Sequence, residues 1–349
     1  MLTSEQARAL VKWKNLLAEA ELDRVLIRDA GNQPSQIAEK SQVLARLLGE
    51  GKEVERRDLQ ACVPDETLST LEELGLVNRT GEKIAPAYRL VFHLGLWLFC
   101  EKVSRSAKFY YGNDSIELSR ILEGAGGNVL DLCSGVGTQA LMCARSAAHV
   151  TAVEIEPLAA KLFWANAAMN ELSEKVELLN GDLLEPVAGR NFDLISCNPP
   201  FMPAAPGVRL PRFADGGGDG LGIVRRLMAG LPKALAPGGK CEVIGAVLGN
   251  HEGPDLGEFK KMAADSSLAI IIDCITREEL EGETMRKLVA IAMEGAEEDI
   301  ERAFRMHFAN LGATHLYCFL LHASPAPSPM LCASYFDGQG AAFRMVPIP

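Results

Sequence analysis

Several features that define other classes of protein are missing from this sequence of 349 residues. The longest apolar run, LVFHLGLWLFC at 90–100, is about half the roughly 20 residues that a membrane-spanning helix needs. The nine cysteines include no C-x-x-C pair, and their odd number argues against a closed disulfide framework. No His or Cys spacing resembles a zinc site. We therefore expect a cytoplasmic protein with reduced thiols, no membrane partner and no bound metal.

Positive charge is also in short supply. The chain has 35 Lys and Arg against 46 Asp and Glu, a formal net charge of −11. Residues 1–112 hold 16 basic and 16 acidic side chains, whereas residues 113–349 hold 19 and 30, so the whole excess lies in the second part. A negative field repels a phosphate backbone at long range, which makes a nucleic-acid substrate less favoured without excluding it.

The first hundred residues have the spacing of helices. Apolar residues recur at helical intervals over 4–22 and 34–51. The segment 55–90 resembles a winged helix-turn-helix, with its second helix at 64–75. That helix carries four acidic residues and no Lys or Arg, the opposite of what a DNA groove requires. The pattern favours a domain that packs or docks a partner over one that reads DNA.

From residue 128 onward, apolar strand-like runs alternate with helical stretches. This order predicts an α/β fold with a parallel, doubly wound sheet, in which ligands bind at the carboxyl ends of the strands. We expect a helical N-terminal domain over 1–107 and a catalytic domain over 108–349. Two runs, 267–280 and 312–325, have the character of the last two strands, antiparallel at the sheet edge. The Pro/Ser/Gly-rich stretch after them has the composition of a turn.

Three acidic residues mark the ends of successive predicted strands. VLDLCSGVGTQAL (129–141) contains Asp131 and a glycine turn, VTAVEIEP places Glu154 23 residues later, and NGD ends in Asp182. An acid at about this spacing accepts both hydroxyl protons of a ribose. Nicotinamide and methionine-derived cofactors both suit this layout. The latter is favoured because Ala140 stands where a dinucleotide fingerprint has its third Gly, and because Asp131 would repel a pyrophosphate.

FDLISCNPPF, at 192–201, ends the fourth strand-like run on a polar amide and two prolines. Together with the preceding motifs it resembles the class I S-adenosylmethionine-dependent methyltransferases whose fourth strand ends in Asn-Pro-Pro-Phe/Tyr. That branch includes release-factor glutamine N5-, ribosomal-RNA guanine N2- and adenine N6-methyltransferases. The resemblance covers roughly residues 108–250 and extends to bacterial methyltransferases with a helical N-terminal domain. It implies a Rossmann-like sheet of seven strands and S-adenosylmethionine as cofactor.

The resemblance also implies a role for each motif residue. In this branch the target is a nitrogen on a planar sp² carbon, a poor nucleophile because its lone pair is delocalised. The Asn198 side-chain oxygen and the Pro199 carbonyl would accept its two N–H groups, Pro200 would help to fix the backbone, and Phe201 would stack on the planar group. The expected cofactor-binding residues are Tyr111, Asp131, Cys133 (where the family often has Gly), Gly135, Gly137, Glu154, Ile155, Asp182, Leu183 and Asn198.

Three substrate classes stay open at this point. An acidic surface suits a protein side-chain amide, the first hypothesis. The second is an amino-bearing small molecule, with 203–220 as a lid in which Arg209 or Arg212 holds a carboxylate and Asp215 an amine. The third is ribosomal or transfer RNA, for which the chain offers few basic residues. A non-enzymatic scaffold would lack some cofactor residues, and none is missing.

Overall fold

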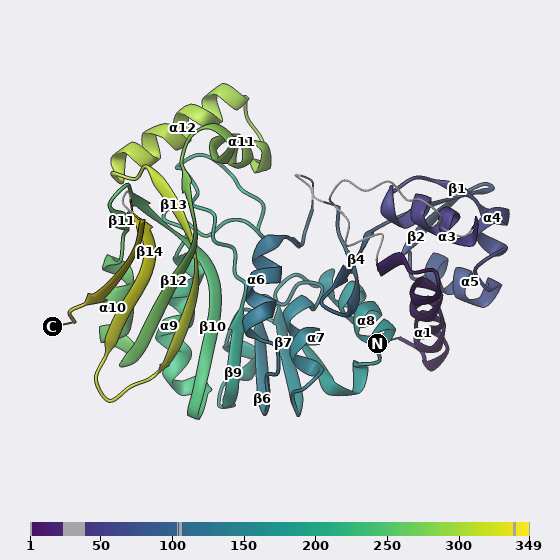
Figure 1. The fold of residues 1–349 in the computed structure, drawn as a ribbon, viewed down its shortest axis with the longest axis horizontal. Coiled ribbons are helices and arrows are strands. Elements are labelled where there is room, and N and C mark those ends of the chain that lie inside the picture. The colour runs from purple at the N-terminus through teal and green to yellow at the C-terminus, as the bar shows by residue number, and fades with distance from the viewer. Residues whose placement is uncertain (1, 24–38, 103, 105–106, 338–339, 349) are drawn as a thin grey trace.

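The computed structural model describes residues 2–23, 39–102, 104, 107–337 and 340–348. Part of the helix predicted over 34–51 therefore lies outside the described residues. Across the part that is described, no helix is both long and apolar enough to cross a membrane. The elements form two regions, a small N-terminal one and a large sheet flanked by helices (Figure 1).

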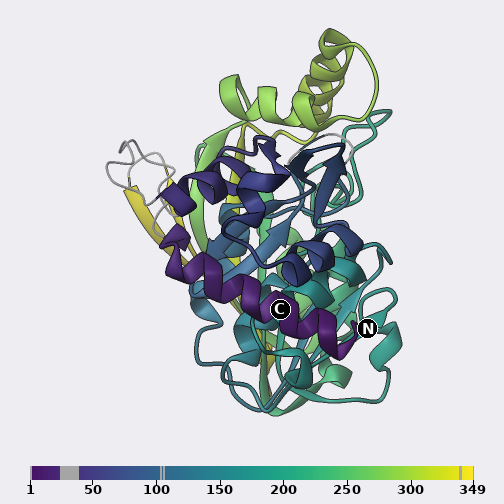
Figure 2. The same cartoon turned by 90° about the vertical axis from the view of Figure 1, so that its right-hand side faces the viewer.

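The N-terminal region has the element order expected of a winged helix. Its elements are α1 (Ser4–Glu19), α3 (Glu39–Leu44), β1 (Val54–Glu55), α4 (Arg56–Gln60), α5 (Asp65–Glu73), β2 (Val77–Thr80) and β3 (Lys83–Pro86). The strands pair antiparallel in the order β1-β3-β2. Helix α5 packs against α1, and Lys12 forms an ion pair of 2.7 Å with Glu66 of α5. The buried face of this acidic helix, with Leu68 and Leu71, thus takes part in the packing of the region, and the choice between a docking domain and a DNA reader stays a prediction (Figure 2).

A two-stranded hairpin, β4 (Arg89–His93) and β5 (Leu96–Cys100), connects the two regions. This is the longest apolar run of the sequence, and every residue of β5 is buried. The free edge of β5 is covered by two side chains of α8 (Ala159–Met169) and its C-terminal flank. Asn166 exchanges hydrogen bonds of 2.7 and 3.1 Å with the backbone of Phe99, and Asn170 exchanges 3.0 and 2.7 Å bonds with that of Trp97. The two amides take the place of a neighbouring strand.

The main sheet has ten strands, ordered β15-β14-β12-β13-β10-β9-β6-β7-β8, with β11 pairing β10. Their bounds are β6 (Asn128–Leu132), β7 (His149–Glu154), β8 (Val176–Asn180), β9 (Phe192–Cys197), β10 (Leu235–Asn250), β11 (Gly253–Pro254), β12 (Leu268–Glu279), β13 (His315–Pro325), β14 (Met330–Asp337) and β15 (Gly340–Val346). The five strands from β8 to β10 are parallel, and β13 is antiparallel to both its neighbours. The order β8-β7-β6-β9-β10-β13-β12 gives the seven predicted strands.

Two expectations about the C-terminal third are wrong. Strands β12 and β13 pair antiparallel as expected, but they do not end the sheet, because β14 and β15 extend it beyond β12. The stretch with the composition of a turn contains β14, whose residues 331–333 are buried. Pro327, Ser328 and Pro329 lie in the short connection between β13 and β14, so the turn occupies only that part.

Helices cover both faces of the sheet, which has one large hydrophobic core on each face, and a third, smaller cluster lies where α11 and α12 pack near the ends of β10 and β13. Helices α6 (Asn113–Ile121), α7 (Thr138–Ala144) and α8 lie on one face, α9 (Gly222–Ala234) and α10 (Gly257–Ser266) on the other, and α11 (Gly282–Ile291) and α12 (Glu297–Asn310) stand beyond the carboxyl end of β12 (Figure 1). Strand residues alternate between the two cores, Val129 in one and Leu130 in the other. The first core continues into the N-terminal region through Trp13, so the boundary at 107/108 stays a prediction.

Candidate active site

A cavity of about 1170 Å³ opens at the carboxyl ends of the parallel strands. Most of the residues expected at the site line it: Tyr111, Cys133, Gly135, Glu154, Ile155, Asp182, Leu183, Asn198, Pro199, Pro200, Phe201, Arg209, Arg212 and Asp215. Two do not, Asp131 and Gly137. The strand order thus brings the glycine turn, the acidic strand ends and the Asn-Pro-Pro-Phe corner to one space, as the sequence predicted.

Asp131 is the clearest correction. We expected its carboxylate inside the glycine turn, facing an amino group of the cofactor, but it is 1% exposed beneath the turn. Ser196 of β9 donates to it at 2.6 Å and the backbone N–H of Ala140 at 3.1 Å. Burial raises the pKa of Asp131 to about 7, against the effect of these donors. The carboxylate therefore fixes the turn to β9 and to α7 from below.

The two glycines of the turn have different tasks. Gly137 caps α7 at φ +91°, and a Cβ there would lie 2.8 Å from the ring of Phe163, so its function is close packing against α8. Gly135, at φ +52°, lines the cavity, and a Cβ built on it would meet nothing within 4 Å. Open space over a backbone turn leaves room for a ligand to approach closely. Cys133 keeps a positive φ of +56° where the family often has Gly.

Glu154 joins the glycine turn to the end of β7. Its two carboxylate oxygens accept the backbone N–H groups of Gly135 and Glu156, both at 2.8 Å. Burial raises the pKa of this carboxyl, while the two N–H donors act in the opposite direction. Each oxygen has a second lone pair, which leaves the side chain able to accept hydroxyl protons of a bound ribose.

Asp182 is less free than the sequence indicated. Its Oδ2 accepts a 2.7 Å hydrogen bond and ion pair from Arg226 of α9, a residue that also lines the cavity. Its neighbour Arg225 pairs with Asp219 at 2.7 Å. One oxygen of Asp182 is left to accept from a ligand.

The Asn198 side chain has a fixed orientation. Its Nδ2 donates to Asp114 Oδ2 at 2.9 Å and to the Ser115 hydroxyl at 3.3 Å, both from the first turn of α6. An ionised carboxylate only accepts hydrogen bonds, so the NH₂ side of the amide must face Asp114. The opposite side, Oδ1, is left as the free acceptor at the cavity that both residues line. Burial raises the pKa of Asp114, and the bond from Asn198 opposes that shift.

A neutral histidine supports this wall of the cavity. His93 of β4 contacts the Tyr111 hydroxyl through Nδ1 and the Ser119 hydroxyl through Nε2, both at 2.9 Å. Burial lowers the pKa of His93 to about 4, so the ring is uncharged near neutrality. The Ser119 hydroxyl in turn donates to the backbone oxygen of Ser115 at 2.7 Å. The hairpin thereby positions both Tyr111 and the helix turn that holds Asn198.

The segment 203–220 is ordered rather than a loose loop. It returns on itself through backbone bonds between Met202 and Ala214 (2.8 Å) and between Gly216 and Met202 (2.9 Å). A Cβ on Gly220 would lie 2.5 Å from the backbone oxygen of Phe201, so this glycine permits a close approach behind the motif. Arg209 forms a 3.5 Å ion pair with Glu294, and both are exposed.

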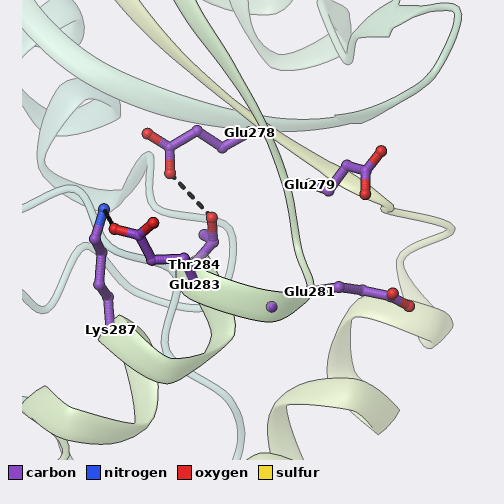
Figure 3. A pocket seen from close by; sticks show the side chains of 7 residues that line it. Glu278, Glu279, Glu281, Glu283, Thr284 and Lys287 are labelled. Atoms are coloured by element: carbon purple, nitrogen blue, oxygen red, sulfur yellow. Dashed lines mark hydrogen bonds and ion pairs between the residues drawn. The ribbon is translucent and has the colours of Figure 1, made fainter.

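A smaller pocket of about 500 Å³ adjoins the cavity at the start of α11. Figure 3 shows four glutamates around it, with Glu278 accepting a 3.0 Å bond from Thr284 and Lys287 paired with Glu283 at 2.9 Å. Glu278, Thr284 and Lys287 line both spaces. The outer end of the cavity is therefore acidic, in keeping with the charge of this half of the chain.

Comparison with known proteins agrees with this geometry. The family model "Methyltransferase small domain" matches residues 115–252. The release factor glutamine methyltransferase of Rhodospirillum rubrum is 31% identical over 255 residues, which cover 60% of this chain and 76% of that protein. The chain belongs to the methyltransferase family that includes this release factor glutamine methyltransferase. The ribosomal protein uL3 glutamine methyltransferase of Bradyrhizobium diazoefficiens is 38% identical over 127 residues, 33% of this chain and 40% of that one.

The solved tRNA m1G37 methyltransferase of M. jannaschii is also similar, with 15% identity, a TM-score of 0.41, and coverage of 69% of this chain and 55% of that one. The methyltransferase described here is an S-adenosylmethionine-dependent N-methyltransferase. Its cavity fits that cofactor, because the open face of Gly135 and the acceptor oxygens of Glu154 line one continuous space with Asn198.

Sequence reasoning missed three residues that shape the cavity. Asp114 and Ser115 orient Asn198 from 84 and 83 positions away, and Arg226 holds Asp182 from another helix. Asp114 lies in the first turn of α6, the helix that precedes β6, the first parallel strand of the main sheet along the chain. The only sequence signal for Asp114 was its position with Ser115 in the polar first turn of a helix that precedes the first parallel strand.

Proposed function

We propose that this methyltransferase transfers a methyl group to the side-chain amide nitrogen of a glutamine in a protein. The observation that carries the proposal is the orientation of Asn198, whose NH₂ group is held by Asp114 and Ser115. An acceptor oxygen fixed at the cavity suits a target that presents N–H groups. A primary amide presents two, and the Pro199 carbonyl would accept the second.

Alkylating an amide requires its lone pair to be withdrawn from conjugation with the carbonyl. Accepting both N–H groups holds the nitrogen so that the lone pair points along one direction, which replaces a random encounter by a placed one. S-adenosylmethionine supplies an electrophilic methyl group on a positively charged sulfur. Transfer of that methyl group would leave S-adenosylhomocysteine and an alkylated nitrogen that is acidic enough to pass its proton to water. No strong general base is then needed, and the part of Asn198 and Pro199 is to hold the nitrogen in place.

Asp114 strengthens this arrangement electronically. A carboxylate that accepts from one end of an amide draws electron density toward the other end, which makes Oδ1 of Asn198 a better acceptor. Its negative charge also favours the positive charge that develops on the substrate nitrogen. Both effects are largest in a partly buried site such as this one.

Three features support a protein as the substrate. The relatives named above act on a release factor and on ribosomal protein uL3. The cavity opens at its outer end beside an acidic pocket, which suits a protein partner better than a phosphate backbone. The excess of acid in residues 113–349 disfavours a nucleic acid.

The test is methyl transfer from labelled S-adenosylmethionine to purified release factor, to uL3 and to fractionated lysate of the source cells. Acid-free enzymatic digestion should release N5-methylglutamine from a labelled protein. Asn198→Ala should lower the rate at least about 1000-fold while leaving cofactor affinity within about threefold, because Oδ1 acts on the acceptor nitrogen. Label confined to RNA or to small molecules would contradict the proposal and would select one of the other two substrate classes.

A further inference from the structure

Arg89 of β4 reaches the cavity from the N-terminal region. One terminal nitrogen of its guanidinium donates to the backbone oxygen of Tyr111 at 3.2 Å, and the group lies 5.6 Å from the centre of the Tyr111 ring. Its Nε is buried and has no hydrogen-bond partner among the described residues. A buried N–H without an acceptor is costly, and a guanidinium offers its donors as a fork that matches a carboxylate.

The other cations lining the cavity are already occupied or lie in solvent. Arg226, Arg209 and Lys287 form ion pairs with Asp182, Glu294 and Glu283, respectively. Lys108 and Arg212 are exposed. Arg89 is half-buried, and within the described part of the chain no carboxylate pairs with it. A partly desolvated cation exerts a stronger field than an exposed one.

S-adenosylmethionine carries one anionic group, the carboxylate of its amino-acid part. Asp114, Glu154 and Asp182 give the cavity wall a negative character that repels such a group, so its binding needs a cation at a defined place. We propose that Arg89 binds the carboxylate of S-adenosylmethionine. The inference rests on the cofactor assignment within the proposed function and adds a cofactor-binding residue that the sequence did not indicate.

The assignment gives the N-terminal region a part in the active site. Arg89 lies on the same strand as His93, which holds Tyr111 and, through Ser119, the turn containing Ser115. One strand of the hairpin would therefore contact the cofactor directly and support the residues that orient Asn198. Asp131, expected at the amino-acid end, is buried and cannot contribute there.

The experiment compares three nucleosides by calorimetry on the full chain: S-adenosylmethionine, decarboxylated S-adenosylmethionine and methylthioadenosine, which lacks the whole amino-acid part. For Arg89→Ala we expect affinity for S-adenosylmethionine to fall about 10- to 100-fold, the range for a hydrogen bond to a charged group. Affinity for the other two should change less than about threefold. Arg89→Lys keeps the charge but loses the fork, and should lie between wild type and Arg89→Ala.

The matched control is Lys108→Ala, which removes an exposed cavity cation and should leave all three affinities unchanged. Equal losses for all three nucleosides in Arg89→Ala would overturn the inference and show that Arg89 only supports Tyr111. A selective loss in Arg212→Ala or Lys108→Ala would overturn it in favour of that cation. If wild type binds none of the three, the cofactor assignment fails instead, so the two failures are distinguishable. Thermal melting of each free variant verifies that the fold is intact.

Discussion

The side-chain amide of Asn198 is oriented by the carboxylate of Asp114 on α6. Asp114 is therefore a positioning residue, and substituting it should change the methylation rate. In Asp114→Asn the isosteric amide removes the charge and can still fill the space. We expect kcat to fall about 10- to 100-fold with KM and cofactor affinity nearly unchanged, because the loss concerns the acceptor strength of Oδ1. Steady-state kinetics and calorimetry measure the two parts separately.

A pH profile separates this role from simple support. Burial raises the pKa of Asp114, so the wild-type rate should decline on the acid side at a higher pH than an ordinary aspartate would give. Asp114→Asn has no such group and should lose that part of the profile. An unchanged acid limb in the variant would mean that Asp114 only fills space beside Asn198.

Asp131 gives a stability prediction with a definite sign. Its pKa is about 7 in the folded chain against an ordinary value of 3.8, so the folded state holds the proton more tightly than the unfolded one. The free energy of unfolding therefore falls as pH rises from about 4 to about 7. Relative to Asp131→Asn, which has no titrating group, wild type should lose up to about 4 kcal/mol over that range. Urea unfolding of both proteins at pH 4 and pH 8 measures it, and parallel curves would exclude the assignment.

The same residues show why some of the site was predictable. Glu154 and Asn198 end strands, and parallel strands carry their ends to one edge, so their meeting followed from the order of elements. Asp131 lies one residue before the end of β6, and its direction depends on Ser196 of the neighbouring strand, which no local pattern reports. Asp114 and Arg89 act across 84 and 22 positions, respectively, so only the folded chain places them.

At the scale of elements, the hairpin and α8 are joined by amide side chains rather than by a sheet. Asn166 is fully buried, so Asn166→Ala leaves the backbone groups of Phe99 and the oxygen of Val136 without partners and should cost about 3 kcal/mol or more. Asn170 is half-buried, where water can replace its amide, and Asn170→Ala should cost about 1 kcal/mol. Denaturant unfolding compares the two. Equal losses would contradict this account of how β5 is covered.

The sequence predicted only part of how the hairpin β4–β5 packs. The run at 90–100 was recognised as core from its composition, and β5 is buried throughout. The sequence did not predict that Asn166 and Asn170, four residues apart on a later helix, would pair with alternate residues of this strand. These contacts join residues that lie 67 and 73 positions apart. The turn-like stretch near the C-terminus misled for the opposite reason, since Pro327, Ser328 and Pro329 give it a turn signal directly before the apolar residues that pair in β14.

At the scale of the whole molecule, the first hydrophobic core runs from α1 through the hairpin into α7 and α8. Removing residues 1–107 should therefore expose a large apolar surface and lower the melting midpoint by more than about 10 °C or leave the protein insoluble. Removing 338–349 deletes β15, most of whose side chains are exposed, and should lower the melting midpoint by a few degrees. Calorimetric melting tests both. A stable fragment 108–349 that binds S-adenosylmethionine normally would contradict the shared core and the inference on Arg89 together.

Asn166 has one further contact, a 3.0 Å bond to the backbone oxygen of Val136 in the glycine turn. A single amide thus touches both the hairpin strand and the loop over which the nucleoside would sit. Hydrogen exchange at the Phe99 amide should therefore report whether the cofactor is bound, because a ligand that stabilises the glycine turn also slows the local opening of that strand. This exchange rate can be measured in the wild-type chain, without knowledge of the methyl acceptor.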